Sequence, residues 1–169
     1  MSPRQGNGGA EKVARMHLAE FNFGTLAYPW GDPRIAGFED AVDQVNAIGA
    51  RSPGFVWRMS DEDMDAAQND PNGPLRDRPN TASTLSTWES PYALYHFVTK
   101  TLHARIMRGA PDWFVPGDSG HLVCWWVPAN YRPNVAEGMT KWQLLQDHGE
   151  SEKVFDAKRL KALALGQPA

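Results

Sequence analysis

The segment from His121 to Val127 constrains the fold most, because it has the composition of a strand that is apolar on both faces. Successive side chains of a strand point to opposite sides of the sheet. The two faces would be Leu122, Cys124 and Trp126 on one side and Val123, Trp125 and Val127 on the other. Both faces then need an apolar cover, which predicts a fold made of packed layers.

Three further strands are predicted from the pattern of side chains. Alternation predicts a strand from Met16 to Tyr28, with Leu18, Glu20 and Asn22 on one face and Ala19, Phe21 and Phe23 on the other. Short runs of bulky residues predict strands at 55–59 and 84–88.

Helices are predicted where apolar residues recur at helical spacing after a candidate N-cap. Asp32, Ser90 and Asn134 are such caps, and Asn134 has Glu137 at capping-box spacing. The helix after Ser90 is expected to continue as far as Ile106. The order strand, helix, strand, strand, helix, strand predicts an α+β fold of the ferredoxin-like βαββαβ type with an antiparallel sheet.

The remaining segments divide the chain into a domain and its extensions. Residues 1–14 are predicted as a disordered N-terminal arm, 15–150 as the domain, and 151–169 as a partly helical C-terminal tail. Residues 60–82 are acidic at their start, contain prolines 71, 74 and 79, and lack periodicity, which predicts a long loop. Such a loop is either a lid or a disordered insert.

A homodimer is expected from the same layering argument. A ferredoxin-like sheet has its helices on one face, so the opposite face needs another cover. A second copy of the chain is the simplest cover, which predicts a dimeric α+β barrel.

Composition excludes several classes of function. The net charge is −3 and no basic stripe occurs, which disfavours nucleic-acid binding. No apolar run is long enough to span a membrane, and no secretory signal is apparent, so the expected location is the cytoplasm. The single cysteine, Cys124, excludes an internal disulfide and a cysteine zinc cage. Motifs for nucleotide binding, zinc proteases and serine hydrolases do not occur.

Several runs of sequence resemble one family. They are SPGFVWR at 52–58, LSTWES at 85–90 and LVCWWVPA at 122–129, together with His103-Ala104, Trp113-Phe114 and Arg132-Pro133. These runs are similar to the domain-of-unknown-function family 3291 (DUF3291), which is grouped with the dimeric α+β barrels. The wider group includes cofactor-free antibiotic-biosynthesis monooxygenases, haem-degrading monooxygenases, polyketide cyclases and muconolactone isomerases. Because one fold carries all of these reactions, the resemblance alone does not choose between them.

Three residues are candidates for catalysis. The resemblance to haem-binding relatives implies that His103 could ligate iron, whereas an imidazole could equally act as a general base. On a straight helix, however, His103 would face solvent or a dimer partner. The oxygenases that the chain resembles place an asparagine on the first strand, which corresponds to Asn22 and could stabilise an oxygen species or an enolate. Asn22 could equally be a structural residue that hydrogen-bonds a neighbouring side chain or edge backbone group. Glu20 lies on the same face, where burial would raise its pKa and make it a proton acceptor, unless it lies near solvent.

Five residues are candidates for substrate binding: Trp57, Arg58, Trp88, Phe97 and Trp126. Aromatic linings suit flat apolar substrates or a porphyrin, although tryptophans on strands are more often core or interface residues. Arg58 could neutralise a carboxylate or propionate, or lie free at the surface.

Three functions are compatible with these residues. The first is a small-molecule tailoring enzyme of the oxygenase, cyclase or isomerase type, which acts on an apolar aromatic or polyketide-like substrate without a nucleotide cofactor. The second is a haem protein or enzyme with His103 as axial ligand. The third is a non-catalytic dimeric module that binds a small ligand.

Overall fold

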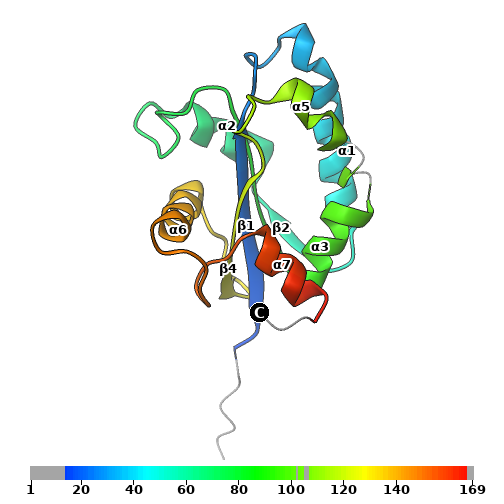
Figure 1. Ribbon diagram of the computed structural model, residues 1–169, viewed down its shortest axis with the longest axis vertical. Helices are drawn as coiled ribbons and strands as arrows, with labels where there is room; N and C mark the ends of the chain where they lie inside the picture. The colour runs from blue at the N-terminus through cyan, green and yellow to red at the C-terminus, as the bar shows by residue number, and fades with distance from the viewer. Residues whose placement is uncertain (1–13, 102, 105–106, 167–169) are drawn as a thin grey trace, which may run out of the picture.

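The computed structural model describes residues 14–101, 103–104 and 107–166. Its centre is a four-stranded antiparallel sheet in the order β2-β3-β1-β4. The strands are β1 (Met16–Thr25), β2 (Phe55–Arg58), β3 (Thr81–Trp88) and β4 (His121–Pro128). Figure 1 shows helices on both sides of this sheet. The strand order and the alternating helices confirm the ferredoxin-like α+β fold that the sequence predicted.

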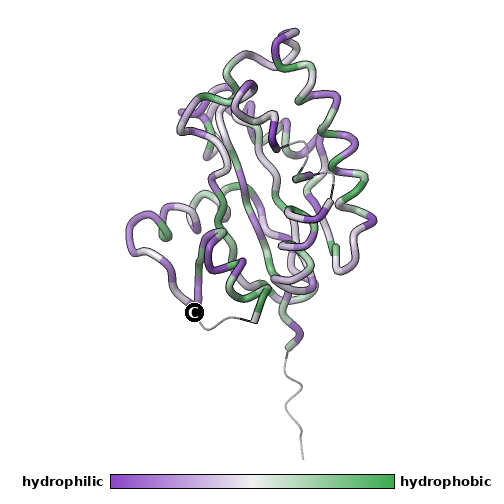
Figure 2. Tube along the Cα trace, turned by 45° about the vertical axis from the view of Figure 1, so that its right-hand side comes forward, coloured by the Kyte–Doolittle hydropathy of each residue, from purple (hydrophilic) through white to green (hydrophobic). Residues whose placement is uncertain are grey.

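One face of the sheet, which we call the α1–α3 face, carries Leu18, Glu20 and Asn22 of β1. It is covered by α1 (Ala36–Arg51), α3 (Pro91–Lys100), α5 (Ala110–Trp113) and α7 (Ala157–Ala164), with the short η1 (Pro33–Ile35) and η2 (Met107–Gly109) between them. Leu18 and Cys124 pack there against Leu94 of α3 and Leu160 of α7. Figure 2 shows hydrophobic and hydrophilic residues alternating along the helices, as expected for amphipathic helices that bury one side.

The opposite face, which we call the α6 face, carries Ala19, Phe21 and Phe23. It is covered by α6 (Val135–His148) and α2 (Asp61–Asn69). Helix α6 approaches the sheet closely at Gly138. A Cβ atom at this position would lie only 2.7 Å from the ring of Phe21. Val123, Trp125 and Val127 of β4 are buried in the same cluster.

The premise behind the expected dimer was therefore wrong. The α6 face is covered by a helix of the same chain, and the apolar set that was expected to need a partner is at most 2% exposed. The sequence predicts a helix after Asn134 but contains no signal that this helix folds back onto the sheet. A homodimer stays a prediction, and it no longer follows from an uncovered sheet face.

The predicted N-caps are confirmed, with one difference. The side chains of Asp32, Ser90 and Asn134 each accept a hydrogen bond from a backbone N–H of the following turn. Glu137 does not complete a capping box. Its carboxylate instead accepts hydrogen bonds from Trp125 Nε1 (2.8 Å) and Tyr131 Oη (2.6 Å), which fastens α6 to β4.

The prediction that residues 60–82 form one long loop was wrong at its start, where α2 lies. Ser60 caps this helix, with its side chain accepting from the N–H of Asp63, and three acidic residues occupy the first turn. Acidic side chains in that position interact favourably with the helix dipole. Only Met64 and Ala67 contact the core, so the apolar pattern is too short to be recognised as periodic.

The helix after Ser90 is shorter than predicted. It ends at Lys100, and Thr101 has an extended backbone with φ −110° and ψ −175°. The hydroxyls of Thr99 and Thr101 donate to the carbonyl oxygens of Tyr95 and Phe97, four residues earlier, instead of pointing to solvent. His103 therefore follows the helix, and the straight-helix argument that turned it toward solvent does not apply.

The predicted C-terminal tail contains α7 and contributes to the core. Val154, Phe155 and Leu160 are buried, and Phe155 pairs with Cys124 through two backbone hydrogen bonds of 2.8 and 3.0 Å. The predicted N-terminal arm lies outside the described residues except for Ala14. Within the part of the chain that the structure describes, no helix has the length and hydropathy of a membrane span.

Candidate active site

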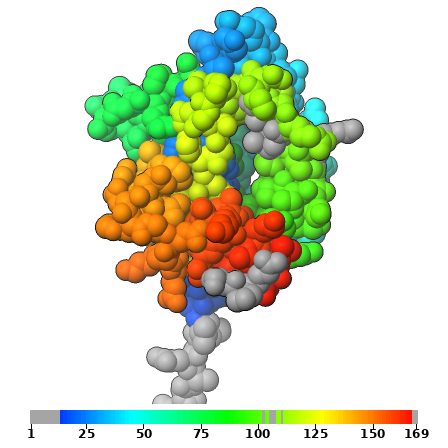
Figure 3. Space-filling view, in the orientation of Figure 1, coloured from blue at the N-terminus to red at the C-terminus, as the bar shows by residue number. Residues whose placement is uncertain are grey.

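A cavity of about 490 Å³ lies between α1, α2 and the β1–β3 half of the sheet. It opens where β2 ends, because β2 pairs only with 86–88 of β3 and leaves Ala82–Thr84 to line the cavity. Phe114 and His103, which belong to the segment between α3 and β4, complete the wall on that side. Figure 3 shows the surface hollowed between α3 and this segment.

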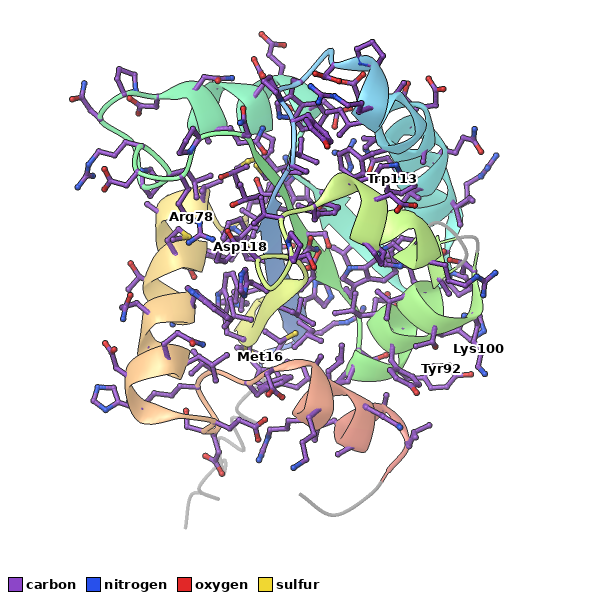
Figure 4. The ribbon with its side chains drawn as sticks, turned by 45° about the horizontal axis from the view of Figure 1, so that its top comes forward. Met16, Arg78, Tyr92, Lys100, Trp113 and Asp118 are labelled. Atoms are coloured by element: carbon purple, nitrogen blue, oxygen red, sulfur yellow. The ribbon has the colours of Figure 1, made fainter. Side chains whose placement is uncertain are left out.

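Three aromatic rings form one wall of the cavity. Phe38 of α1 lies between Trp30 and Phe114, with ring centroids 5.6 and 5.3 Å away. Trp113, which Figure 4 shows against α1, supports Phe38 from behind at 5.9 Å. Such a wall suits the flat face of an aromatic ligand.

Asn22 lines the cavity and is held from behind by Glu20. The Asn22 Nδ2 donates to Glu20 Oε2 at 2.9 Å, and the Ser86 hydroxyl donates to Glu20 Oε1 at 2.6 Å. Trp88 Nε1 in turn donates to the Ser86 oxygen at 2.9 Å. Glu20 and Asn22 share the α1–α3 face because they are two residues apart on β1, and Ser86 is the cross-strand partner of Glu20.

Burial changes the acidity of Glu20. The side chain is 3% exposed, and its removal from water raises the pKa to about 7, although the hydrogen bonds from Ser86 and Asn22 oppose that rise. Glu20 therefore exchanges its proton near neutral pH. It does not line the cavity, so it acts on a ligand only through Asn22.

His103 also lines the cavity, and its tautomer follows from its neighbours. Nδ1 lies 3.3 Å from the carbonyl oxygen of Val98, which can only accept, so Nδ1 carries the proton and Nε2 is the unprotonated nitrogen. The ring packs against Phe97 with a centroid distance of 5.1 Å. Burial lowers the pKa of His103 below its usual 6.5, which keeps the imidazole neutral at pH 7.

Charged side chains concentrate where the cavity opens between α1 and α2. Glu39 and Asp43 of α1 and Asp61 and Asp65 of α2 line it, together with the guanidinium of Arg58. Arg58 is already paired, since its Nη1 lies 2.7 Å from Asp61 Oδ1.

This charge distribution does not fit haem. A haem carries two propionates, which the four carboxylates would repel, and the one guanidinium, Arg58, is already paired with Asp61. As a separate observation, the described residues contain no group of three or more His, Cys, Asp or Glu side chains that could hold a metal ion.

The structure brings together only some of the predicted site residues. Asn22, Arg58 and His103 line the cavity, with Glu20 directly behind. Trp88 is buried in the core, where it stacks on Phe97 at 5.1 Å. Trp126 is 38% exposed and lines a separate hollow beside α7.

Trp57 lies on the α6 face because of an irregularity in β2. The pairing register shifts between Phe55 and Trp57, so these two residues pack on opposite faces although they are two positions apart. Arg132 lies over the Trp57 ring at 5.8 Å. A bulge in a strand of four residues leaves no periodic signal in the sequence.

Most of the cavity wall consists of residues that were not predicted as site residues. Phe38 and Val42 belong to the predicted helix after Asp32 and were not candidates for the site, Trp30 and Phe114 lie in loops, and α2 was assigned to a loop. The wall is identified only when the short β2 is seen to leave β3 uncovered. The one available signal was Thr84, which pairs with Asn22 across the sheet and extends its polar face.

Comparison with known proteins gives one family match. No functionally curated protein shows significant sequence similarity to the chain. Among solved structures, the chain is similar to SnoaB, a cofactor-independent oxygenase from Streptomyces nogalater, with a TM-score of 0.40 and 15% identity over 70% of this chain and 96% of that one. At these values the similarity transfers no chemistry to the chain. The model of a domain of unknown function, DUF3291, matches residues 17–165, and the chain therefore belongs to the DUF3291 family.

Proposed function

We propose that the cavity is an active site for proton-transfer chemistry on an apolar aromatic small molecule. The protein would then be a tailoring enzyme of the cyclase, isomerase or oxygenase type that uses no nucleotide cofactor. The observation that carries the proposal is the convergence on one cavity of a neutral imidazole and an amide held by a buried carboxyl group.

His103 is the proton acceptor in this proposal. Its Nε2 is the unprotonated nitrogen because Nδ1 donates to Val98, and its pKa is lowered by burial. It can take a proton from an acidic C–H or a phenol, which leaves an imidazolium and a substrate anion.

Asn22 stabilises that anion. An amide N–H hydrogen-bonds to an enolate or phenolate oxygen more strongly than to the neutral group, which lowers the barrier to proton removal. When Glu20 is ionised, its carboxylate accepts a hydrogen bond from Asn22 Nδ2 and so fixes the orientation of the Asn22 amide. Glu20 is therefore a positioning residue.

The enolate is the common intermediate of the three reaction types. Return of the proton to another carbon gives an isomer, and attack of the enolate carbon on an internal carbonyl gives a ring. Oxygenation additionally needs dioxygen as a second substrate. The aromatic wall of Trp30, Phe38 and Phe114 supports a flat substrate for each of them.

Hydrogen–deuterium exchange tests the proton-transfer step without knowledge of the product. Anthrone, a flat tricyclic ketone with an acidic C–H, is incubated with the protein in D₂O, and exchange is followed by NMR. We expect catalysed exchange that falls about 100-fold in His103→Gln and roughly tenfold or more in Asn22→Ala. His148→Gln, which changes an exposed histidine on α6, serves as the matched control and should leave the rate unchanged.

The pH profile distinguishes a base from a structural histidine. Because the pKa of His103 is lowered, the neutral base is present above that pKa and is lost as pH falls through it, with a midpoint below 6.5. The exchange rate should follow this curve in the wild type and lose it in His103→Gln. Binding of anthrone without catalysed exchange would contradict the proposal and would identify a ligand-binding module instead.

A further inference from the structure

The acidic residues that line the cavity do not all contribute to the stability of the fold. Four carboxylates line the cavity against one guanidinium, an excess equal to the net charge of −3 of the whole chain. The remaining charges of the chain therefore sum to about zero, and the lining of the cavity carries an excess of negative charge.

Two of the four carboxylates have local structural roles. Asp61 lies in the first turn of α2, where the helix dipole favours a negative charge, and it holds Arg58 and accepts from Asn46 of α1 at 3.5 Å. Glu39 accepts from the backbone N–H of Gly31 at 2.6 Å, which fastens the loop before α1. These two positions are accounted for without a ligand.

Asp43 and Asp65 are different. Asp43 follows Glu39 by four residues on α1 and Asp65 follows Asp61 by four on α2, and like charges at this spacing destabilise a helix. Within the described residues Asp43 accepts no hydrogen bond, and Asp65 accepts only from Asn69 of its own helix. The two side chains thus place negative charge on both sides of the cavity opening at a cost to the helices that bear them.

The aromatic wall reaches the same opening. Trp30 is 46% exposed, so its ring is accessible to a ligand. It lies against Phe38, which precedes Val42 by one turn on α1. The faces of aromatic rings attract ammonium groups, as carboxylates do. A neutral ligand would use only the rings, an anion would be repelled, and an ammonium-bearing aromatic ligand would gain from both.

We infer that the substrate of this site is an aromatic molecule that carries a protonated amine, with its ring against Phe38 and its amine between Asp43 and Asp65. The inference rests on the proposed function, because it names the substrate class of the same cavity. It goes further in requiring a positive charge that the proton-transfer chemistry itself does not need.

Three ligands of one shape and different charge test the inference. They are 2-naphthylmethylammonium, 2-naphthylmethanol and 2-naphthoate, measured by calorimetry at pH 7.5 and low ionic strength. We expect the ammonium to bind about tenfold more tightly than the alcohol, as roughly threefold from each of two partly exposed carboxylates implies, and the naphthoate to bind more weakly than both. Added salt should reduce the preference, because exposed charges are screened.

Paired variants separate the lining charges from the overall field. Asp43→Asn with Asp65→Asn should reduce the preference for the ammonium to about twofold or less and leave the alcohol unchanged. Asp40→Asn with Glu62→Gln removes the same charge from the same two helices at exposed positions that do not line the cavity. This control should keep the preference within about twofold of the wild type.

Each contrary result has a distinct meaning. Equal binding of ammonium and alcohol, with anthrone exchange still catalysed, would overturn this inference and leave the proposed function in place. An equal loss in the control pair would also overturn it, since the preference would then come from the general field. If neither the ammonium nor the alcohol binds and anthrone does not exchange, the proposed function fails as well.

Discussion

The two faces of the sheet differ in what they bury, although both belong to the same strands. On the α6 face, Phe21 contacts Gly138 so closely that no side chain fits between helix and sheet, and the phenyl rings of Phe21 and Phe23 stack at 5.3 Å. On the α1–α3 face, β1 presents Glu20 and Asn22, and α1 stands off far enough to leave the cavity. The difference shows how one strand can provide a packed core and a chemical site through alternate side chains.

The packed face compensates for the open one. A buried carboxyl group and a cavity both reduce stability, and a small domain has little stability to lose. The α6 face supplies apolar contacts from a helix that the basic βαββαβ unit does not contain. We therefore expect substitutions of equal size to have unequal effects on the two faces.

The largest single loss of stability is expected for Phe21→Ala, which we compare with Phe38→Ala. Phe21 is fully buried between β1 and α6, so its truncation should cost about 3–5 kcal/mol of unfolding free energy. Phe38 is half-buried at the cavity wall, and its loss should cost roughly half as much. Urea denaturation of both variants measures the difference. Equal losses would mean that the cavity side is packed as tightly as the α6 face.

Next in size is the effect of Glu20→Gln, which depends on pH. The pKa of Glu20 rises from 4.5 to about 7 on folding, so the folded state binds more protons in this range and stability falls as pH rises from 4.5 to 7. The ionised buried group costs on the order of 3 kcal/mol above pH 7. Glu20→Gln should be more stable than the wild type at pH 8 and similar to it at pH 5. A constant difference across this range of pH would contradict the assignment.

A third pair compares two glycines on the covering helices. Gly138→Ala should destabilise the protein by about 1–3 kcal/mol, because the new Cβ would lie 2.7 Å from the rigid ring of Phe21. Gly37→Ala on α1 would place its Cβ 3.3 Å from the edge of Trp113, and the gain in helix propensity should offset that contact to within about 1 kcal/mol. Thermal unfolding gives both values, and a neutral Gly138→Ala would show that α6 can move away from the sheet.

The smallest effect is expected at Asp118, which lies in the turn before β4 at one end of the sheet. Asp118 accepts from Thr25 at 2.6 Å, His121 at 2.6 Å and Arg78 at 2.7 Å, and Figure 4 shows it beside Arg78. These contacts lower its pKa, chiefly through the Thr25 hydroxyl, so their stabilisation is present above the unfolded pKa and is lost as pH falls through the folded one. Asp118→Asn should cost about 1 kcal/mol at pH 7 and less at pH 3, measured by urea denaturation.

The fold could be predicted from sequence because its main signals are local. Alternation along β1 predicted that Glu20 and Asn22 face the opposite side of the sheet from Phe21 and Phe23. Polar residues before three helical runs predicted their N-caps. These signals are set within a few residues, so a single sequence contains them. The covering role of α6 was not predictable in this way, because it depends on where the chain turns after Pro128.

The site could be predicted only where strand alternation identified it. Asn22 and Glu20 came from the first strand, and the structure joins them by a hydrogen bond. Trp57 was a candidate because it is an aromatic residue on a predicted strand, and the irregularity in β2 places it on the α6 face. The environment of His103 depends on where α3 ends, and the two threonine hydroxyls that bond back to α3 give no signal in a hydropathy pattern.

Trp88 has a consequence for spectroscopy. Its indole N–H donates to the same Ser86 hydroxyl that bonds Glu20, and its ring stacks on Phe97, which in turn contacts His103. The indole proton is therefore a natural reporter, whose chemical shift should change as Glu20 titrates near pH 7 and again when a ligand disturbs His103. The protein thus carries its own internal probe of the cavity, and no label has to be introduced.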